Sequence, residues 1–99
     1  MKKILLVCSA GMSTSILVTK MQKAAEAQGI ECQIEAHGNT NIGRFDGEMD
    51  VCLLGPQIKF ALKKIKEELP SMNVEVIDMK VYAFGDGDAA LKQALDLIK

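Results

Sequence analysis

Short apolar runs recur along this chain, separated by longer segments in which apolar residues have the spacing of a helix. The runs predict four strands, at residues 3–7, 30–36, 50–54 and 74–77. The first and third runs are almost wholly aliphatic, which is typical of central strands covered on both faces. The second alternates apolar and polar residues, as expected for a half-exposed strand at the edge of a sheet.

The segments between the strands predict helices. Helical spacing extends over residues 13–28, over residues 55–69 and from the turn at 85–88 to the end of the chain. Gly29 and Pro70 are expected to end the first two helices. Residues 37–46 are rich in Gly, Asn and Thr and predict a loop, whereas the pattern over 78–84 is ambiguous.

Strand and helix alternate without a linker, repeat or low-complexity segment, which predicts a single α/β domain over residues 1–99. We expect an open, mainly parallel four-stranded sheet with helices on both faces. Right-handed crossovers from a central first strand favour the order 2-1-3-4, as in flavodoxin-like folds. Ligands of such sheets bind beyond the carboxyl ends of the strands, and Cys8 follows the first strand there.

Composition and charge exclude several classes of function. The chain is 48% apolar and 25% charged, as in ordinary globular proteins, and its net charge of −1 argues against a general nucleic-acid binder. No apolar run approaches the ~20 residues that span a bilayer, and the apolar start is too short for a signal peptide. We therefore expect a cytoplasmic protein without membrane insertion.

The three cysteines have no metal-ligand spacing, and their odd number in a chain without a secretion signal favours reduced thiols. Cys32 and Cys52 lie in strand patterns, where cysteine acts as a small apolar residue. Cys8 differs, because it ends a strand and precedes small and hydroxylated residues that lead into a helix.

A helix start carries unpaired backbone N–H groups and the positive end of the helix dipole. Such a site binds anions and favours the thiolate form of a nearby cysteine. We therefore expect Cys8 to be a nucleophile that attacks phosphorus and carries a phosphoryl group. The expected phosphate-binding loop consists of Ser9, Ala10, Gly11, Met12, Ser13, Thr14 and Ser15. Met12 either faces a partner or folds back onto the core, and no metal or organic cofactor is implied.

With its segment from Cys8 to Ser15, the chain resembles the cytoplasmic IIB component of the bacterial sugar phosphotransferase system (PTS), lactose/cellobiose (chitobiose) class. The likeness extends over residues 51–58 and 74–78, whereas residues 85–88 match less well. The resemblance implies a phosphotransferase component whose Cys8 accepts phosphate from a histidine of the IIA protein. It further implies that Cys8 passes the phosphate to a sugar held by the membrane transporter IIC.

Two alternatives compete with this interpretation. Low-molecular-weight protein tyrosine phosphatases share the architecture and use a C-x5-R loop, whose arginine holds the phosphate. Thr14 stands at that arginine position, and the single arginine of the chain is Arg44, in another segment. This difference favours a carrier over a hydrolase. The other alternative is a non-catalytic phosphate-binding regulatory module, but the chain has neither a GxGxxG nor a GxxxxGK[ST] motif.

Other polar residues also follow strand ends. His37 is expected to be a solvated loop residue, Asp78 a helix cap or turn former, and Tyr82 a packing residue. Gln57 is expected to be exposed at a helix start. Whether His37, Asp78 or Tyr82 takes part in the chemistry stays open at this level.

Overall fold

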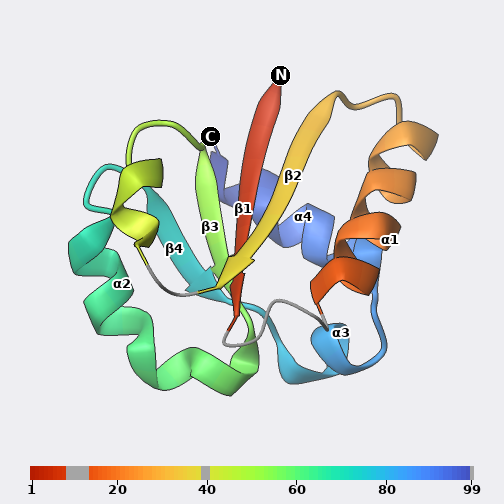
Figure 1. Ribbon diagram of the computed structural model, residues 1–99. Helices are drawn as coiled ribbons and strands as arrows, with labels where there is room; N and C mark the ends of the chain where they lie inside the picture. Colours follow the sequence, from red (N-terminus) through yellow and green to blue (C-terminus); the bar gives the residue numbers. More distant parts are fainter. Residues whose placement is uncertain (9–13, 39–40, 99) are drawn as a thin grey trace.

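A four-stranded parallel sheet forms the centre of the computed structural model, which describes residues 1–8, 14–38 and 41–98 (Figure 1). The strands are β1 (Lys2–Cys8), β2 (Cys32–Gly38), β3 (Val51–Leu54) and β4 (Asn73–Val76). The α-helices are α1 (Thr14–Ala27), α2 (Leu62–Glu68), α3 (Met79–Ala83) and α4 (Gly87–Ile98). Two 3₁₀ helices, η1 (Ile42–Phe45) and η2 (Pro56–Ala61), complete the elements described.

The strand order is β2-β1-β3-β4, which confirms the order predicted from the sequence. In the register of the sheet, Cys8 lies opposite Gly38 of β2, and Val7 lies opposite Leu54 of β3. The aliphatic strands β1 and β3 occupy the middle of the sheet because both of their faces are buried.

The two faces of the sheet have separate cores, because successive residues of a strand point to opposite sides. Ile4 and Leu6 of β1 pack with α1 and α4, in a core that contains Leu17 and Leu91. Leu5 and Val7 pack on the other side with η1, η2 and α2; that core contains Ile42, Ile58, Ile65 and Leu69. Figure 1 shows α1 and α4 on one side of the sheet and α2 on the other, as expected from the sequence.

The second strand begins two residues later than predicted. Gly29 adopts a left-handed φ of 69° and ends α1, as expected, but the N–H of Ile30 still donates to the carbonyl of Ala25 at 2.9 Å. Ile30 therefore belongs to the turn that closes the end of α1, and not to the strand. The strand extends instead to Gly38, so the expectation that residues 37–46 form a loop is wrong at its start.

Two further segments differ in detail from the sequence prediction. The helix expected over residues 55–69 consists of η2 followed by α2, and Ile58 has non-helical φ and ψ values of −115° and 27°. The ambiguous segment contains the short helix α3, whose N-cap is Asp78. The Asp78 carboxylate accepts a hydrogen bond from the backbone N–H of Lys80 at 2.9 Å, which confirms the expected cap.

The carboxyl ends of the strands and the beginning of α1 lie at one edge of the sheet, and α3 lies at the same edge (Figure 1). We call this the carboxyl edge. β1 begins and α4 ends at the opposite edge, where the Asn73 side chain donates to the carbonyl of Leu97. Within the described part of the chain, no helix has the length and apolar character needed to cross a membrane.

Candidate active site

Cys8 is the last residue of β1 and lies at the carboxyl edge between the ends of β2 and β3. The N–H of Gly55 donates to the carbonyl of Val7 at 2.8 Å, which holds the chain after β3 alongside Cys8. Ligands of open α/β sheets bind at this point, where the connections leave the central strand in opposite directions. Cys8 is buried, with 1% of its surface exposed.

Gly55 has no β-carbon, and neighbouring side chains surround the space where one would lie, beside Cys8. A β-carbon at Gly55 would lie 3.1 Å from the β-carbon of Cys8 and 3.6 Å from Cε1 of Tyr82. Its φ and ψ of −63° and 144° are accessible to any residue, so the space and not the backbone conformation requires glycine here. Sequence reasoning missed this role, because a glycine before a proline also opens a helix.

Tyr82 of α3 packs against the core shared by α1 and α4, which confirms the packing role expected for it. Its ring also borders the space at Gly55. The short helix α3 therefore brings an aromatic ring to the side of Cys8, although 74 positions separate the two residues in the sequence.

The expected phosphate-binding loop falls largely outside the described residues. Ser9, Ala10, Gly11, Met12 and Ser13 are not described, and Thr14 and Ser15 are described only as the first two residues of α1. The beginning of α1 lies at the same edge of the sheet as the end of β1 (Figure 1). A helix start, which attracts anions, and a thiol therefore lie on one edge.

The other two cysteines lie in environments of a different kind. Cys52 of β3 is completely buried, and this burial raises the pKa of its thiol to about 12. Cys32 is partly buried at the start of β2, and burial raises the pKa of its thiol as well. None of the three cysteines forms a disulfide. Cys32 and Cys52 thus serve as small core residues, as expected.

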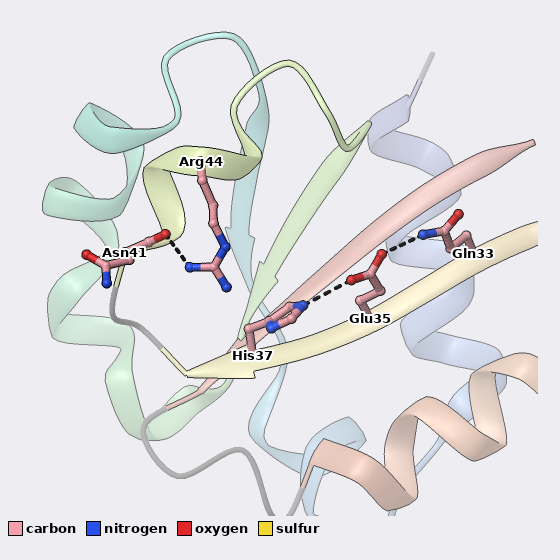
Figure 2. A network of polar contacts seen from close by, with 5 residues as sticks. All are labelled: Gln33, Glu35, His37, Asn41 and Arg44. Carbon is pink, nitrogen blue, oxygen red and sulfur yellow. Dashed lines mark hydrogen bonds and ion pairs between the residues drawn. The ribbon is translucent and has the colours of Figure 1, made fainter.

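His37 belongs to β2 and lies at the carboxyl edge, but on the other face of the sheet from Cys8. It pairs with Val7, whose side chain belongs to the core on the α2 side, and Cys8 follows Val7 with the opposite orientation. Its ring lies 4.7 Å from the ring of Phe45. Its Nε2 lies 3.0 Å from a carboxylate oxygen of Glu35 (Figure 2). Hydrogen bonds from His37 and Gln33 lower the pKa of Glu35.

Arg44 lies near His37, because both side chains contact the ring of Phe45. It donates to the backbone carbonyl of Asn41 at 2.7 Å (Figure 2). Its guanidinium carbon lies 4.4 Å from the centre of the Phe45 ring. The single arginine of the chain therefore belongs to η1, on the α2 side of the sheet. The described residues contain no group of three or more His, Cys, Asp or Glu side chains that could hold a metal ion.

A family model described as the lactose/cellobiose-specific IIB subunit of the PTS matches residues 3–93. The chain belongs to this family. IIB components of the PTS are phosphotransferase components of sugar transport, which confirms the functional class expected from the resemblance. The alternative of a phosphatase-like hydrolase is not favoured.

Similar proteins support the assignment of this IIB chain over nearly its whole length. It is 46% identical to the oligo-beta-mannoside-specific EIIB component of Bacillus subtilis, with 99% of this chain and 97% of the relative covered. The solution structure of a cellobiose-specific IIB protein from Borrelia burgdorferi is 36% identical, with a TM-score of 0.82 over 98% of this chain and 91% of that one.

A lactose-specific IIB domain from Streptococcus pneumoniae has the same fold, with a TM-score of 0.86. Its sequence identity is 15%, and the match covers 99% of the IIB chain and 98% of that domain. The four-stranded parallel architecture is therefore the architecture of solved IIB structures, as expected from the strand order.

Four apolar side chains on or next to α1, η2 and α3 of this IIB protein are exposed. Ile16 lies in the first turn of α1, Phe60 in η2, and Met79 and Phe84 in or next to α3, and each is more than 60% exposed. A groove of about 390 Å³ lies between the start of α1 and residues 82–85. Solvent-exposed apolar surface of this kind marks sites of protein association.

Proposed function

We propose that this IIB chain is a cytoplasmic phosphocarrier in which Cys8 accepts a phosphoryl group from a phosphohistidine of IIA. Cys8 then delivers the group to a sugar bound by IIC. The observation that carries the proposal is the position of Cys8, at the end of the central strand β1 and at the edge where α1 begins. No other cysteine or histidine of the chain combines these two features.

The reaction is two successive displacements at phosphorus. In the first, the thiolate of Cys8 attacks, a sulfur–phosphorus bond forms, and the nitrogen–phosphorus bond of the donor breaks with its electron pair on the imidazole. In the second, a sugar hydroxyl oxygen attacks, the sulfur–phosphorus bond breaks to return the thiolate, and the hydroxyl proton passes to solvent. The N–H groups at the start of α1 and the loop Ser9–Ser15 are the proposed ligands of the phosphoryl oxygens.

The environments of the other candidates support Cys8 as the nucleophile. With a thiol pKa of about 12, Cys52 carries almost no thiolate near neutral pH. His37 is turned to the opposite face of the sheet and interacts with Glu35 and Phe45. The absence of an arginine between Cys8 and Ser15 supports a carrier, because a phosphocysteine without a charge clamp is hydrolysed slowly.

The exposed apolar residues Ile16, Phe60, Met79 and Phe84 support the proposed docking of both partners at the carboxyl edge. The thiol has to face IIA and IIC in turn, so we propose modest interfaces that dissociate readily. Similar proteins are named for oligo-beta-mannoside, galactose and cellobiose. We propose a sugar of this range as the acceptor, with the particular sugar selected by IIC.

The test is phosphorylation by a phosphorylated IIA protein, followed by mapping of the modified residue by mass spectrometry. Cys8→Ser should fold normally and accept no phosphate, because the serine hydroxyl is a far weaker nucleophile near neutral pH. Cys32→Ala is the matched control: we expect a loss of about 1–2 kcal/mol in stability and normal phosphorylation. Phosphate on His37, or normal transfer by Cys8→Ser, would contradict the proposal.

A further inference from the structure

A polar side chain that the reaction described above does not use reaches the space at Gly55, beside Cys8. A β-carbon at Gly55 would lie 2.6 Å from Oε1 of Gln57 and 3.1 Å from the β-carbon of Cys8. Both groups therefore border the same point. The side chain of Gln57 therefore folds back toward Gly55, and its Oε1 lies near the point that the Cys8 β-carbon also approaches.

Packing of the core does not account for a carboxamide at this position. Gln57 stands between the buried residues Pro56 and Ile58 but is itself exposed. Among the residues that the structure describes, its side chain makes no hydrogen bond. Its amide N–H groups are thus available to an additional acceptor at the carboxyl edge.

We propose that Gln57 is a second binding group for the phosphoryl group on Cys8. Its exposed carboxamide turns over, which brings Nε2 to the place that Oε1 occupies in this structure, and Nε2 donates a hydrogen bond to the phosphoryl group. Gly55 is a positioning residue in this arrangement, because its missing side chain lets the carboxamide and Cys8 approach each other. The inference rests on the proposed function, since it requires a phosphocysteine at Cys8. It adds a ligand that comes from the turn after β3, separate from the start of α1.

A neutral amide is suited to a carrier. A hydrogen bond from an uncharged donor to a phosphoryl dianion orients the group and stabilises its charge. An arginine would add a full positive charge and a bidentate contact, which hold phosphate more tightly. Gln57 can therefore orient the phosphoryl group for the acceptor without retaining it.

The deciding variant is Gln57→Glu, which keeps the shape of the side chain and replaces the amide donor by a carboxylate. We expect phosphorylation of Cys8 by phosphorylated IIA to slow by about tenfold or more, the effect of losing one hydrogen bond to a charged group. Gln28→Glu is the matched control, because it adds the same charge at the exposed far end of α1. This control should react at the wild-type rate.

A second measurement separates contact from indirect effects. In ¹⁵N-labelled protein, the Nε2 amide signals of Gln57 should shift when Cys8 is phosphorylated, while those of Gln28 stay in place. Gly55→Ala should abolish this shift, because the added methyl group meets both the carboxamide and Cys8. Thermal unfolding of Gln57→Glu should match the wild type, since the side chain is exposed.

The outcomes distinguish this inference from the proposed function. If Cys8 is phosphorylated but Gln57→Glu reacts like Gln28→Glu, or the amide signals of Gln57 do not move, the inference is wrong and the carrier function stands. If the wild-type protein is not phosphorylated at Cys8, the proposed function itself fails. A slower reaction of Gln57→Glu together with a shifted Gln57 amide supports both.

Discussion

Position along the strand gives Cys8 and Cys52 different chemistry. Cys8 ends a strand and lies beside Gly55, which Gln57 and Tyr82 also approach, at the edge where the connections leave the sheet. Cys52 lies in the neighbouring strand β3, where apolar side chains surround it on all sides. A cysteine in the middle of a covered strand is a packing residue, whereas the same residue at the strand end is open to neighbouring polar groups.

Burial of Cys52 predicts a pH dependence of stability. Its pKa rises from 9.0 to about 12 in the folded protein, so between these pH values the unfolded chain loses the proton while the native protein keeps it. The free energy of unfolding should therefore fall as pH rises through this window, by up to about 1.4 kcal/mol per pH unit. Below the pKa of the unfolded thiol, both states keep the proton and the contribution of Cys52 is constant.

Urea unfolding of the wild type and of Cys52→Ala, measured at neutral pH and at about pH 10, tests this expectation. The variant should be less stable at neutral pH because it loses buried volume. Its stability should fall less between the two pH values than that of the wild type. Equal decreases in both proteins would show that ionisation of Cys52 does not contribute.

At the scale of elements, the contact between α1 and α4 depends on one glycine. Gly87 is the first residue of α4, and a β-carbon there would lie 2.5 Å from the carbonyl carbon of Lys20 and 2.6 Å from its oxygen. Both atoms belong to the backbone of α1. A side chain at residue 87 can therefore be accommodated only if the two helices move apart.

We predict that Gly87→Ala lowers the free energy of unfolding by about 1–3 kcal/mol, as overpacked contacts usually do. Gly43→Ala is the matched control, because a β-carbon there would meet its nearest neighbour, the Glu68 carbonyl oxygen, at 3.7 Å. This control should change stability by less than about 0.5 kcal/mol. Urea unfolding of both variants measures the difference, and an unchanged stability of Gly87→Ala would disprove the close helix contact.

The elements that the sequence predicted correctly are those with a clear pattern of apolar residues. The four strands and their order, α1 and α4 follow from periodicity and crossover rules. Residues 55–69 divide into η2 and α2 because Ile58 has a non-helical conformation, and no feature of the sequence indicates that conformation. α3 has five residues, too few to display a helical period.

The candidate site, too, could be predicted only in part from the sequence. Cys8 could be predicted because a strand, a cysteine and a helix start follow each other directly in the sequence. The approach of Gly55, Gln57 and Tyr82 to Cys8 could not, because it joins three segments that only the tertiary fold brings together. His37 was placed at the correct edge, but its face follows from the register between β1 and β2.

At the scale of the whole molecule, the position of the single arginine distinguishes this protein from a hydrolase. The single arginine belongs to η1, on the other side of the sheet from the core that α1 forms with α4. The described elements at the carboxyl edge carry several exposed apolar residues instead. This arrangement provides a surface for a partner protein but no guanidinium for a phosphate that arrives in solution.

We therefore predict that the isolated protein hydrolyses aryl phosphates no faster than Cys8→Ser, because attack on a free phosphomonoester dianion lacks a charge clamp. Phosphocysteine formed from phosphorylated IIA should persist long enough to be isolated, and it should be lost rapidly only when IIC and sugar are supplied. Turnover of an aryl phosphate by wild type and Cys8→Ser, measured side by side, checks this. Substantial turnover that requires Cys8 but no partner would support the phosphatase class.

The beginning of β1 and the end of α4 lie at the edge of the sheet opposite Cys8 (Figure 1). A tether fastened to either terminus therefore leaves the reactive side facing outward. The protein can be anchored to a sensor surface by one end while IIA approaches from solution. For the same reason, a neighbouring domain joined at either end can hold this chain close to its partners without standing between them and the sulfur, so that local concentration replaces tight binding.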